Sequence, residues 1–548
     1  MSNGKTNLEL FPRPASGLVK AIGVGGAFIF GVHCISLSSS GFIPFSWVAS
    51  VWPGASIIGL LLIAMLTSSV HGYTFAVIGT SMPRSGADYV LASRVLSPIL
   101  AFMASWVLVI FSGVVVGGLI AWIPKSAIPA LLQPMSIIFN NPSLSSWAEY
   151  TASPSGSLLI GTLCVVITFL LMLLPNRLVL RTLSIGLVLG LLAWLIILIT
   201  LMSASGADTF KNAWNQFMSS TGPWGSFDKR LELARLAGMN ISSSTATMTL
   251  AGLIMGFWIF YGYYIPTFFA GEIRKADTTN TLVKASLSSI FVTGTIFIAA
   301  VYFLQRLVPQ EWIAAEGYIF NNPDAVTKAA GEPVMGLPWI TFYAAILNPN
   351  GWLVGFVAVA WIYTLINLAQ TYFFYSSRII FSWAFDRVVP EFLTYVHPKN
   401  NSPIYCLLFI ALLAELGVID SSQGGPLGTQ LTFAFFAVVT QIVSVVAITV
   451  FPFRAPEQFR LCPEFVTKRL LGIPRITILG ALTLIYLAWM VLASFLYPAV
   501  GVSNPSKTLQ LLAMLAISGF AVFQIARLYH KNKSGLDITN IYKTTPPA

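Results

Sequence analysis

The stretch GVGGAFIFG at residues 23–31 lies inside the first long apolar segment of this chain, and GFWIFYGYYIP at residues 256–266 lies inside another, five segments later. Glycine weakens a helix by removing side-chain restraint, and proline removes a backbone donor. Within a bilayer, unpaired backbone groups are tolerated only where protein buries them or where they line a cavity. Two interruptions at matching places in two halves of a polytopic chain therefore predict a mid-membrane site for a small solute.

The composition is that of an integral membrane protein. Of the 548 residues, 56% are hydrophobic and only 9% are charged, whereas a soluble protein carries about 25% charged residues. The net charge is +11, but no basic run is interleaved with aromatic residues. The composition therefore indicates a lipid bilayer as the surroundings and argues against a nucleic-acid partner.

We predict an all-α polytopic chain, because about twelve apolar segments approach the roughly 20 residues needed to cross a bilayer. They are expected at 17–39, 55–81, 98–123, 156–174, 182–204, 246–270, 285–307, 351–383, 403–419, 428–453, 475–498 and 507–528. The expected organisation is an N-terminal tail at 1–16, a five-helix repeat at 17–204, a second repeat at 246–453, two peripheral helices at 475–528 and a polar tail at 529–548.

The basic residues predict the orientation. Most of the 30 Lys and Arg residues fall on one side when the N-terminus is placed in the cytoplasm, and cytoplasmic loops carry an excess of these residues. We therefore expect both termini in the cytoplasm, in a multi-pass protein of the plasma membrane. Short interfacial helices are expected in the outer loops, near Glu311 and at 338–345.

The two interrupted segments also resemble each other: AFIFG at 27–31 is similar to WIFYG at 258–262. Spans five apart run in opposite directions, so this similarity predicts a five-plus-five inverted repeat with discontinuous helices 1 and 6. An interrupted helix presents N–H groups that attract a carboxylate and C=O groups that attract an ammonium, and an amino acid carries both. The alternative is that these glycines only allow close helix packing.

Sequence motifs of catalysis are absent. The chain has four His and four Cys residues and lacks HExxH, GxSxG, CxxC and P-loop patterns. These patterns supply metal ligands, activated nucleophiles or a nucleotide site. We therefore expect no enzyme activity, no metal and no cofactor.

Four motifs in order resemble the amino acid permeases of the amino acid–polyamine–organocation superfamily. They are PRSGADYVLASR at 83–94, the stretch from Trp258 to the Gly-Glu-Ile at 271–273, FSWAFDRVVP at 381–390, and His-Pro-Lys at 397–399 followed by Ser-Pro at 402–403. The resemblance covers about residues 15–455.

The resemblance implies a ten-helix core in two inverted halves, with a substrate site between spans 1, 3, 6 and 8. It implies that the substrate contacts the two breaks, which we place at Gly26, Ala27, Phe28, Ile29, Phe30 and Gly31 and at Trp258, Phe260, Tyr261 and Gly262. Trp258 falls where relatives keep an aromatic gate.

Two departures from the family pattern matter. Many members carry Gly-Ser-Gly or Gly-Ala-Gly at the first break, whereas the glycines here cluster earlier, which leaves the register of that break open by two to four positions. Many members also carry Asp where this chain has Tyr261. The aromatic lining favours a neutral or apolar amino acid over arginine or a polyamine.

Transport is expected to be coupled to H⁺ or Na⁺. Sodium would use carbonyls of span 1 and hydroxyls of span 8, and the candidates there are Thr371, Ser376 and Ser377. Protons could use Glu415, His33 or His71; the alternative is that these are hydrogen-bonded core residues or, for Glu415, an interfacial one.

Charges in the matched loop motifs predict an inner gate. Asp88, Arg94 and Glu272 are expected to form ion pairs that hold the inner side closed. The alternative is that they are solvated loop charges, each contributing little.

These observations together predict a secondary active amino acid transporter that works by alternating access. One alternative is an exchanger or symporter for another small organic solute, such as a polyamine or a nucleobase. A channel is the other; it should show a ring of repeated pore-lining polar residues, and none is seen in the sequence.

Overall fold

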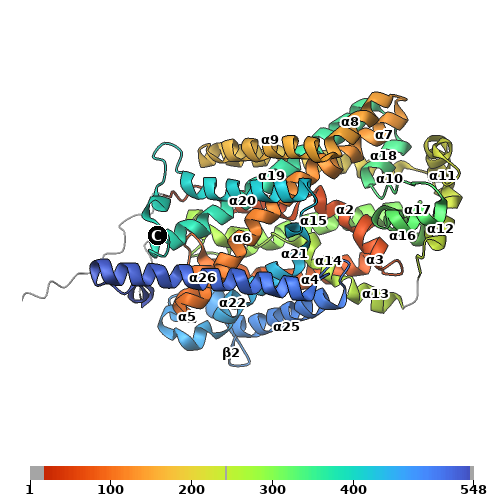
Figure 1. Cartoon of the computed structure of the whole chain (residues 1–548). Coiled ribbons are helices and arrows are strands. Elements are labelled where there is room, and N and C mark those ends of the chain that lie inside the picture. The colour runs from red at the N-terminus through yellow and green to blue at the C-terminus, as the bar shows by residue number, and fades with distance from the viewer. Residues whose placement is uncertain (1–17, 241–243, 544–548) are drawn as a thin grey trace, which may run out of the picture.

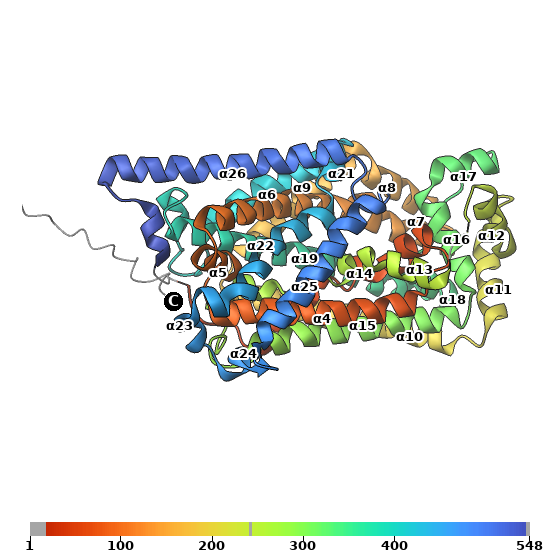
Figure 2. The ribbon, with the colours of Figure 1, turned by 90° about the horizontal axis from the view of Figure 1, so that it is seen from below.

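The computed structural model describes residues 18–240 and 244–543, so the tail expected at 1–16 lies outside the described residues. Most of the described chain is helical (Figure 1). The long helices run roughly along one axis. One end of this bundle carries α11, α12, α16 and α17, which we call the cap end, and the other carries the C-terminus (Figures 1 and 2).

Eleven segments of the described chain are long and apolar enough to cross a membrane. Nine are single or extended helices: α4 (Ile57–Ser81), α9 (Pro154–Met172), α10 (Asn176–Ser203), α15 (Thr281–Gln305), α19 (Gly351–Phe385), α20 (Ile404–Ser422), α22 (Phe433–Arg454), α25 (Arg475–Leu496) and α26 (Pro505–Ser534). A tenth begins with α6 (Pro98–Trp122) and continues through the π-helical turn η2 (Ile123–Ala127) into α7 (Pro129–Ile138).

The eleventh candidate span is itself interrupted. It consists of α1 (Val24–Ile35), α2 (Ser39–Ile43), the π-helical turn η1 (Pro44–Val48) and α3 (Ala49–Val51). The expected sixth span is divided into α13 (Thr245–Ala251), α14 (Leu253–Phe260) and two 3₁₀ turns, η4 (Ile265–Phe268) and η5 (Ala270–Glu272). Adding this segment to the eleven candidates accounts for the twelve expected spans and confirms that helices 1 and 6 are discontinuous.

Shorter elements close the two ends of the bundle. At the cap end lie α8 (Pro142–Ala152), α11 (Ala207–Met218), η3 (Ser219–Thr221), α12 (Phe227–Leu236), α16 (Gln310–Asn321), α17 (Pro323–Ala330), α18 (Ile340–Leu347) and α21 (Leu427–Gln430). The remaining elements are α5 (Ala87–Val95), η6 (Glu391–Thr394), α23 (Pro456–Arg460), α24 (Glu464–Thr467), η7 (Ile538–Lys543) and a hairpin of β1 (Arg469–Leu470) and β2 (Ile473–Pro474), in which Arg469 pairs with Pro474. The helices expected near Glu311 and at 338–345 are α16 and α18.

Polar side chains begin several of the spans. Ser56 accepts a hydrogen bond from Gly59 N–H at the start of α4, Asn350 accepts from Trp352 and Leu353 at the start of α19, and Asn504 accepts from Lys507 at the start of α26. Each cap satisfies N–H groups that have no partner within the first helical turn.

The C-terminal region is more ordered than the polar tail expected at 529–548. Helix α26 lies at the edge of the bundle and continues to Ser534 (Figures 1 and 2). The chain then turns back, and η7 buries Ile538 and Tyr542. The apolar side chains of η7 explain this difference, because they gain burial by packing on the bundle.

Candidate functional site

The second interruption lies where the sequence predicts it. Helix α14 ends at Phe260, and residues 261–264 form a turn before η4. Gly262 has a φ of +115°, a backbone conformation that residues with a Cβ rarely adopt. Tyr261 and Gly262 therefore lie in the break, whereas Trp258 and Phe260 belong to the last turn of α14.

The first interruption lies further along the chain than predicted. Helix α1 runs unbroken through Gly26, Ala27, Phe28, Ile29, Phe30 and Gly31 and ends at Ile35. The break is at Ser36, Leu37 and Ser38, where Ser36 has a φ of 68°. The placement of the first break at 26–31 is thus wrong, by more than the two to four positions left open.

Close packing explains the misleading glycines, as the alternative interpretation holds. A Cβ on Gly31 would lie 2.8 Å from the Ser289 hydroxyl of α15, and a Cβ on Gly26 would lie 2.9 Å from the Ile22 side chain. Phe30 is buried, with its ring 4.8 Å from that of Phe269 and 4.6 Å from that of Phe374.

Side chains form hydrogen bonds with the residues of the first break. The Trp194 indole N–H of α10 donates to Leu37 O at 2.9 Å, and the Thr364 hydroxyl of α19 donates to Ser38 Oγ at 3.0 Å. Ser39 N–H donates to Ser36 Oγ at 3.2 Å. Hydroxyls can satisfy a membrane backbone that leaves the helix, so the serine-rich run at 36–40 is the sequence signal that marks this break.

The two interruptions are in contact. A Cβ on Gly262 would lie 2.6 Å from the carbonyl carbon of Cys34, and a Cβ on Gly31 would lie 3.6 Å from Tyr263 O. Ser286 of α15 donates to Tyr263 O at 2.9 Å and fixes the second break from the other side. The end of α1 and the unwound turn after α14 therefore meet inside the bundle.

Both breaks leave main-chain groups without protein partners. Within the described chain, no hydrogen bond to protein is donated by the N–H groups of Leu37, Ser38, Gly262, Tyr263 or Tyr264. The carbonyl oxygens of Cys34 and Phe260 likewise accept none from described residues. Buried backbone groups normally have partners, so these positions can bind a polar solute through main-chain atoms.

Aromatic rings surround the second break. Trp258 is the residue of α14 that is not buried, and its ring stacks on Phe433 at 5.1 Å and 19°. The Tyr261 ring packs against Phe433 at 4.4 Å. This lining offers apolar surface and no formal charge to a bound solute.

Hydrogen bonds join the second break to two further spans. His71 Nε2 of α4 lies 2.8 Å from Gln441 Oε1 of α22, and Tyr263 Oη lies 2.8 Å from His71 Nδ1. Gln441 Nε2 donates to Tyr264 Oη at 2.5 Å. His71 is thus a hydrogen-bonded core residue, and so is His33, whose Nε2 lies 2.6 Å from Leu183 O.

The residues predicted as a cation site lie along α19, nearer the C-terminal end than the first break. Thr371 donates to Leu368 O at 2.7 Å and Ser377 donates to Phe374 O at 2.7 Å, both within their own helix. Ser376 is buried beside them. Thr364 of α19, about two turns before Thr371, donates to Ser38 Oγ in the first break, and the Thr371 hydroxyl lies beside the Cys34 thiol in the last turn of α1.

Two of the three predicted gate residues form buried ion pairs. The Glu272 carboxylate lies 2.7 Å from Arg378 Nε, and it also accepts a hydrogen bond from Asn176 at 3.0 Å. The backbone of Ile22 pairs with that of residues 272–274, so the start of span 1, the end of span 6, and α10 and α19 meet here. Arg94 forms a bidentate pair with Asp386, both contacts at 2.8 Å.

Asp88 does not join either ion pair. It is 5% exposed and lines a small cavity between α5, α6 and α22. Burial raises the pKa of its carboxyl to about 7. The three predicted gate residues therefore occupy three separate positions at the C-terminal end of the bundle.

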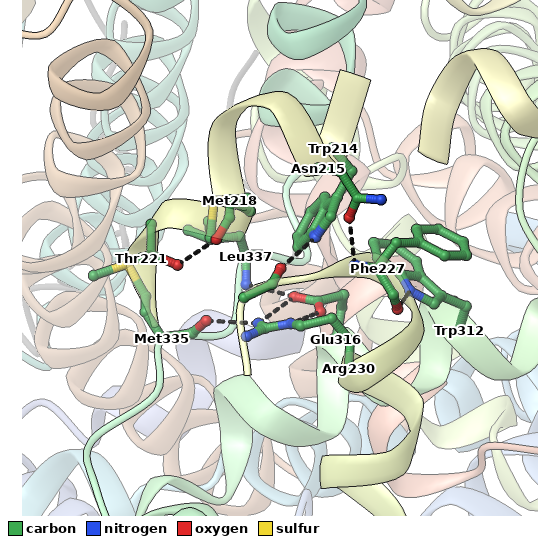
Figure 3. Close-up of polar contacts among 11 residues, drawn as sticks. Trp214, Asn215, Met218, Thr221, Phe227, Arg230, Trp312, Glu316, Met335 and Leu337 are labelled. Carbon is green, nitrogen blue, oxygen red and sulfur yellow. Dashed lines mark hydrogen bonds and ion pairs between the residues drawn. The ribbon is translucent and has the colours of Figure 1, made fainter. Parts of the chain in front are cut away.

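A buried ion pair that the sequence does not reveal organises the cap end (Figure 3). Arg230 of α12 pairs with Glu316 of α16, and both are at most 1% exposed. Arg230 also donates to Met335 O at 2.6 Å, and Leu337 N–H donates to Glu316 at 3.0 Å. The pair thus anchors the segment that leads into α18.

That segment reaches the second half of the first span. The Trp339 ring stacks on Phe42 of α2 at 4.1 Å and 19°, and Phe320 of α16 packs against Phe42 at 5.9 Å. Trp122, at the end of α6, lies 6.0 Å from Phe42. Aromatic side chains therefore pack on the second half of the first span at the cap end, and the buried ion pairs of Glu272 and Asp386 lie at the C-terminal end.

Two interrupted membrane segments that meet inside a bundle of membrane-spanning helices define a class of transport proteins. The sequence profile of the family described as amino acid permease matches residues 20–520. The chain therefore belongs to the amino acid permease family; it is a multi-pass integral membrane protein and a transporter, not an enzyme.

Named relatives are distant. The chain is 24% identical over 437 residues to a large neutral amino acids transporter small subunit 2 of Oryctolagus cuniculus, covering 77% of this chain and 69% of that protein. It is 24% identical over 385 residues to the proteins of the same name from Mus musculus and Homo sapiens, covering 68% of this chain and 60% of each of them. The chain thus matches less than two thirds of the length of the mouse and human proteins.

Proposed function

We propose that this permease moves neutral amino acids across the plasma membrane by alternating access, with both termini in the cytoplasm. The observation that carries the proposal is the contact between two breaks, several of whose main-chain groups have no hydrogen-bond partner among the described residues. The N–H groups of Leu37 and Ser38 precede α2 and suit a carboxylate. The carbonyl groups of Cys34 and Phe260 end α1 and α14 and suit an ammonium.

The side chains around the breaks support a neutral substrate. The rings of Trp258, Tyr261 and Phe433 offer apolar surface, and the described residues of the two breaks, 36–38 and 261–264, include no acidic side chain that could pair with arginine or a polyamine. The relatives named above bear the description of large neutral amino acids, which agrees with this chemistry.

Alternating access is supported by the different ways in which the two ends are closed. Buried ion pairs and backbone pairing hold the C-terminal end, and stacked rings hold the cap end. The five-plus-five inverted repeat over 17–204 and 246–453 relates the interrupted spans in this proposal. Coupling to Na⁺ through Thr371, Ser376 and Ser377 remains a prediction, since two of these hydroxyls donate to carbonyls of their own helix.

A binding screen tests the proposal. The purified protein is heated with each of the twenty amino acids, with and without sodium, at two pH values, and its melting temperature is recorded. A ligand at 100 times its dissociation constant stabilises the folded state by about 2.7 kcal/mol, so leucine-like amino acids should raise the melting temperature. Proteoliposomes should then take up leucine in preference to arginine; the reverse preference would overturn the substrate class.

A further inference from the structure

Asp88 differs from the other buried acids of the described chain. Four acidic side chains are buried there, and three of them, Glu272, Glu316 and Asp386, each form an ion pair with a buried arginine. Asp88 has no ion-pair partner among the described residues. Because an isolated buried carboxylate is unfavourable by several kcal/mol, its charge needs neutralising by a bound cation.

The surroundings of Asp88 form a built pocket. Its cavity is lined by the hydroxyl-bearing residues Ser105 of α6 and Thr440 and Ser444 of α22. Asp88 Oδ1 has no hydrogen-bond partner within the part of the chain that the structure describes, while the N–H groups of Asp88 and Tyr89 and the Ser444 hydroxyl contact the carboxyl group. The free volume corresponds to roughly one water molecule, which suits a proton carried by water better than a hydrated metal ion.

Other titratable groups near α5 are engaged elsewhere. Arg94 pairs with Asp386 and lies over the ring of Tyr542, whose hydroxyl is 2.8 Å from that of Tyr89. The lining from α6 and α22 is limited to hydroxyl-bearing and apolar side chains, and α4 and η4, which also pack on α5, contribute no residue to it. No charged side chain of the lining therefore competes with a proton for Asp88.

Asp88 is mechanically linked to the second break. It lies in the first turn of α5, directly after the loop in which Gly86 N–H donates to Phe268 O at 2.7 Å and Ser85 pairs with Phe269. Phe268 and Phe269 connect the break to Glu272. Movement of α5 would therefore move both the break and the ion pair that closes this end.

We propose that the pocket around Asp88 binds a proton, and that its occupancy is coupled to closure of the C-terminal end of the bundle during transport. The neutral carboxyl fits this small pocket and holds α5 against α6 and α22. The charged carboxylate needs water and favours an arrangement in which the pocket opens. The coupling, unlike the proton site itself, rests on the proposed transport function.

Infrared difference spectroscopy of the purified full chain, titrated with pH, tests the proton site directly. The wild type should show the carbonyl band of a protonated carboxyl group that disappears as the pH rises, and Asp88→Asn should lack it. Glu415→Gln is the matched control, because Glu415 accepts a hydrogen bond from Thr162 at 2.6 Å and lies on another span; it should retain the band. An unchanged band in Asp88→Asn would overturn the proposal.

Leucine uptake into proteoliposomes tests the coupling. A pH gradient should drive accumulation in the wild type and in Glu415→Gln, while Asp88→Asn should lose at least about tenfold of the gradient-driven component and still show leucine-induced thermal stabilisation. If the pH gradient drives no accumulation in the wild type, and leucine uptake is equal in the wild type and Asp88→Asn, the coupling is overturned but the transport function stays intact. Sodium-driven uptake that Asp88→Asn abolishes would also overturn the proton assignment.

Two further results keep the tests decisive. If Asp88→Asn fails to fold, Asp88→Glu takes its place, because it retains a carboxyl group and should keep a titrating band. Absence of the band in a folded Asp88→Glu would overturn the site. If the wild type neither binds nor transports leucine, the proposed function fails, and the infrared titration of Asp88 still decides whether the proton site exists.

Discussion

Gly262 lies directly against Cys34, so that a Cβ on this glycine would approach the Cys34 carbonyl carbon, Cβ and Sγ to 2.6 Å. This contact joins the two interrupted spans at their breaks, beside the backbone pairing of Ile22 with Ile273 nearer the C-terminal end of the bundle. It depends on two properties of glycine: the missing side chain, and tolerance of a φ of +115°.

Replacing Gly262 with alanine should separate the two breaks. The backbone strain alone is on the order of 1–3 kcal/mol, and the overlap with Cys34 adds to it, so leucine uptake should fall by at least about tenfold. Gly118→Ala is the control, because a Cβ there meets nothing within 4 Å. Equal uptake by the two variants would contradict this role of Gly262.

Trp258 should affect substrate affinity through its partly exposed ring. Trp258→Ala removes the ring stacked on Phe433, and aromatic contacts of this kind contribute about 0.5–1.5 kcal/mol. The apparent KM for leucine uptake should rise by about two- to tenfold. Trp352→Ala, at a residue 90% exposed, should leave KM unchanged; a comparable rise there would show that the effect is not specific to the site.

The ion pair between Glu272 and Arg378 should contribute strongly to stability. Glu272→Gln leaves Arg378 buried without a counter-charge, and losing one partner of a buried pair lowers the free energy of unfolding by about 3–5 kcal/mol. Asp277→Asn is the control, since Asp277 is 43% exposed in its contact with Lys20 and exposed pairs contribute little. Thermal melting of the two variants in detergent makes the comparison, and similar melting temperatures would refute the expectation.

The ion pair between Arg230 and Glu316 should control the order of the cap segment 335–339. In Glu316→Gln, hydrogen exchange of this segment should increase, because Leu337 N–H loses a charged acceptor and Arg230 its partner. Glu311→Gln breaks a pair whose side chains are 58% and 47% exposed and should exchange like the wild type. Exchange that is unchanged in Glu316→Gln would mean that the stacked rings alone hold this segment.

Asp88 should make stability depend on pH in a defined direction. The pKa is raised to about 7 in the folded protein and is about 3.9 in an unfolded chain, so between these values the folded state holds the extra proton. The contribution of Asp88 to the free energy of unfolding is therefore complete below about pH 4, where both states are protonated. It decreases as the pH rises from there and is lost as the pH passes through about 7. Wild-type melting temperatures should fall from pH 5 to pH 8 more steeply than those of Asp88→Asn; parallel curves would rule this out.

Several features could be predicted from the sequence because they depend on local composition. Apolar length identified the membrane spans, since crossing a bilayer requires a fixed length of helix. The second break could be located because Gly262 and Pro266 interrupt a span within a few residues of each other. The motifs around Glu272 and Asp386 correctly placed charged residues at one end of the bundle.

The partners of these residues were decided by the tertiary structure. Glycines at 26–31 permit either a break or close packing, and only the position of Ser289 and Ile22 makes them packing residues. The first break instead begins at Ser36, where two side chains from distant spans reach it: Trp194 donates to the Leu37 carbonyl and Thr364 donates to the Ser38 hydroxyl oxygen. The chain by itself thus determined which segments enter the membrane and that two of them unwind, because these follow from hydrophobicity and backbone restraint. Which backbone groups of the described chain lack partners, and which of its buried acids lacks an arginine, depends on side chains that the fold brings together from far along the chain.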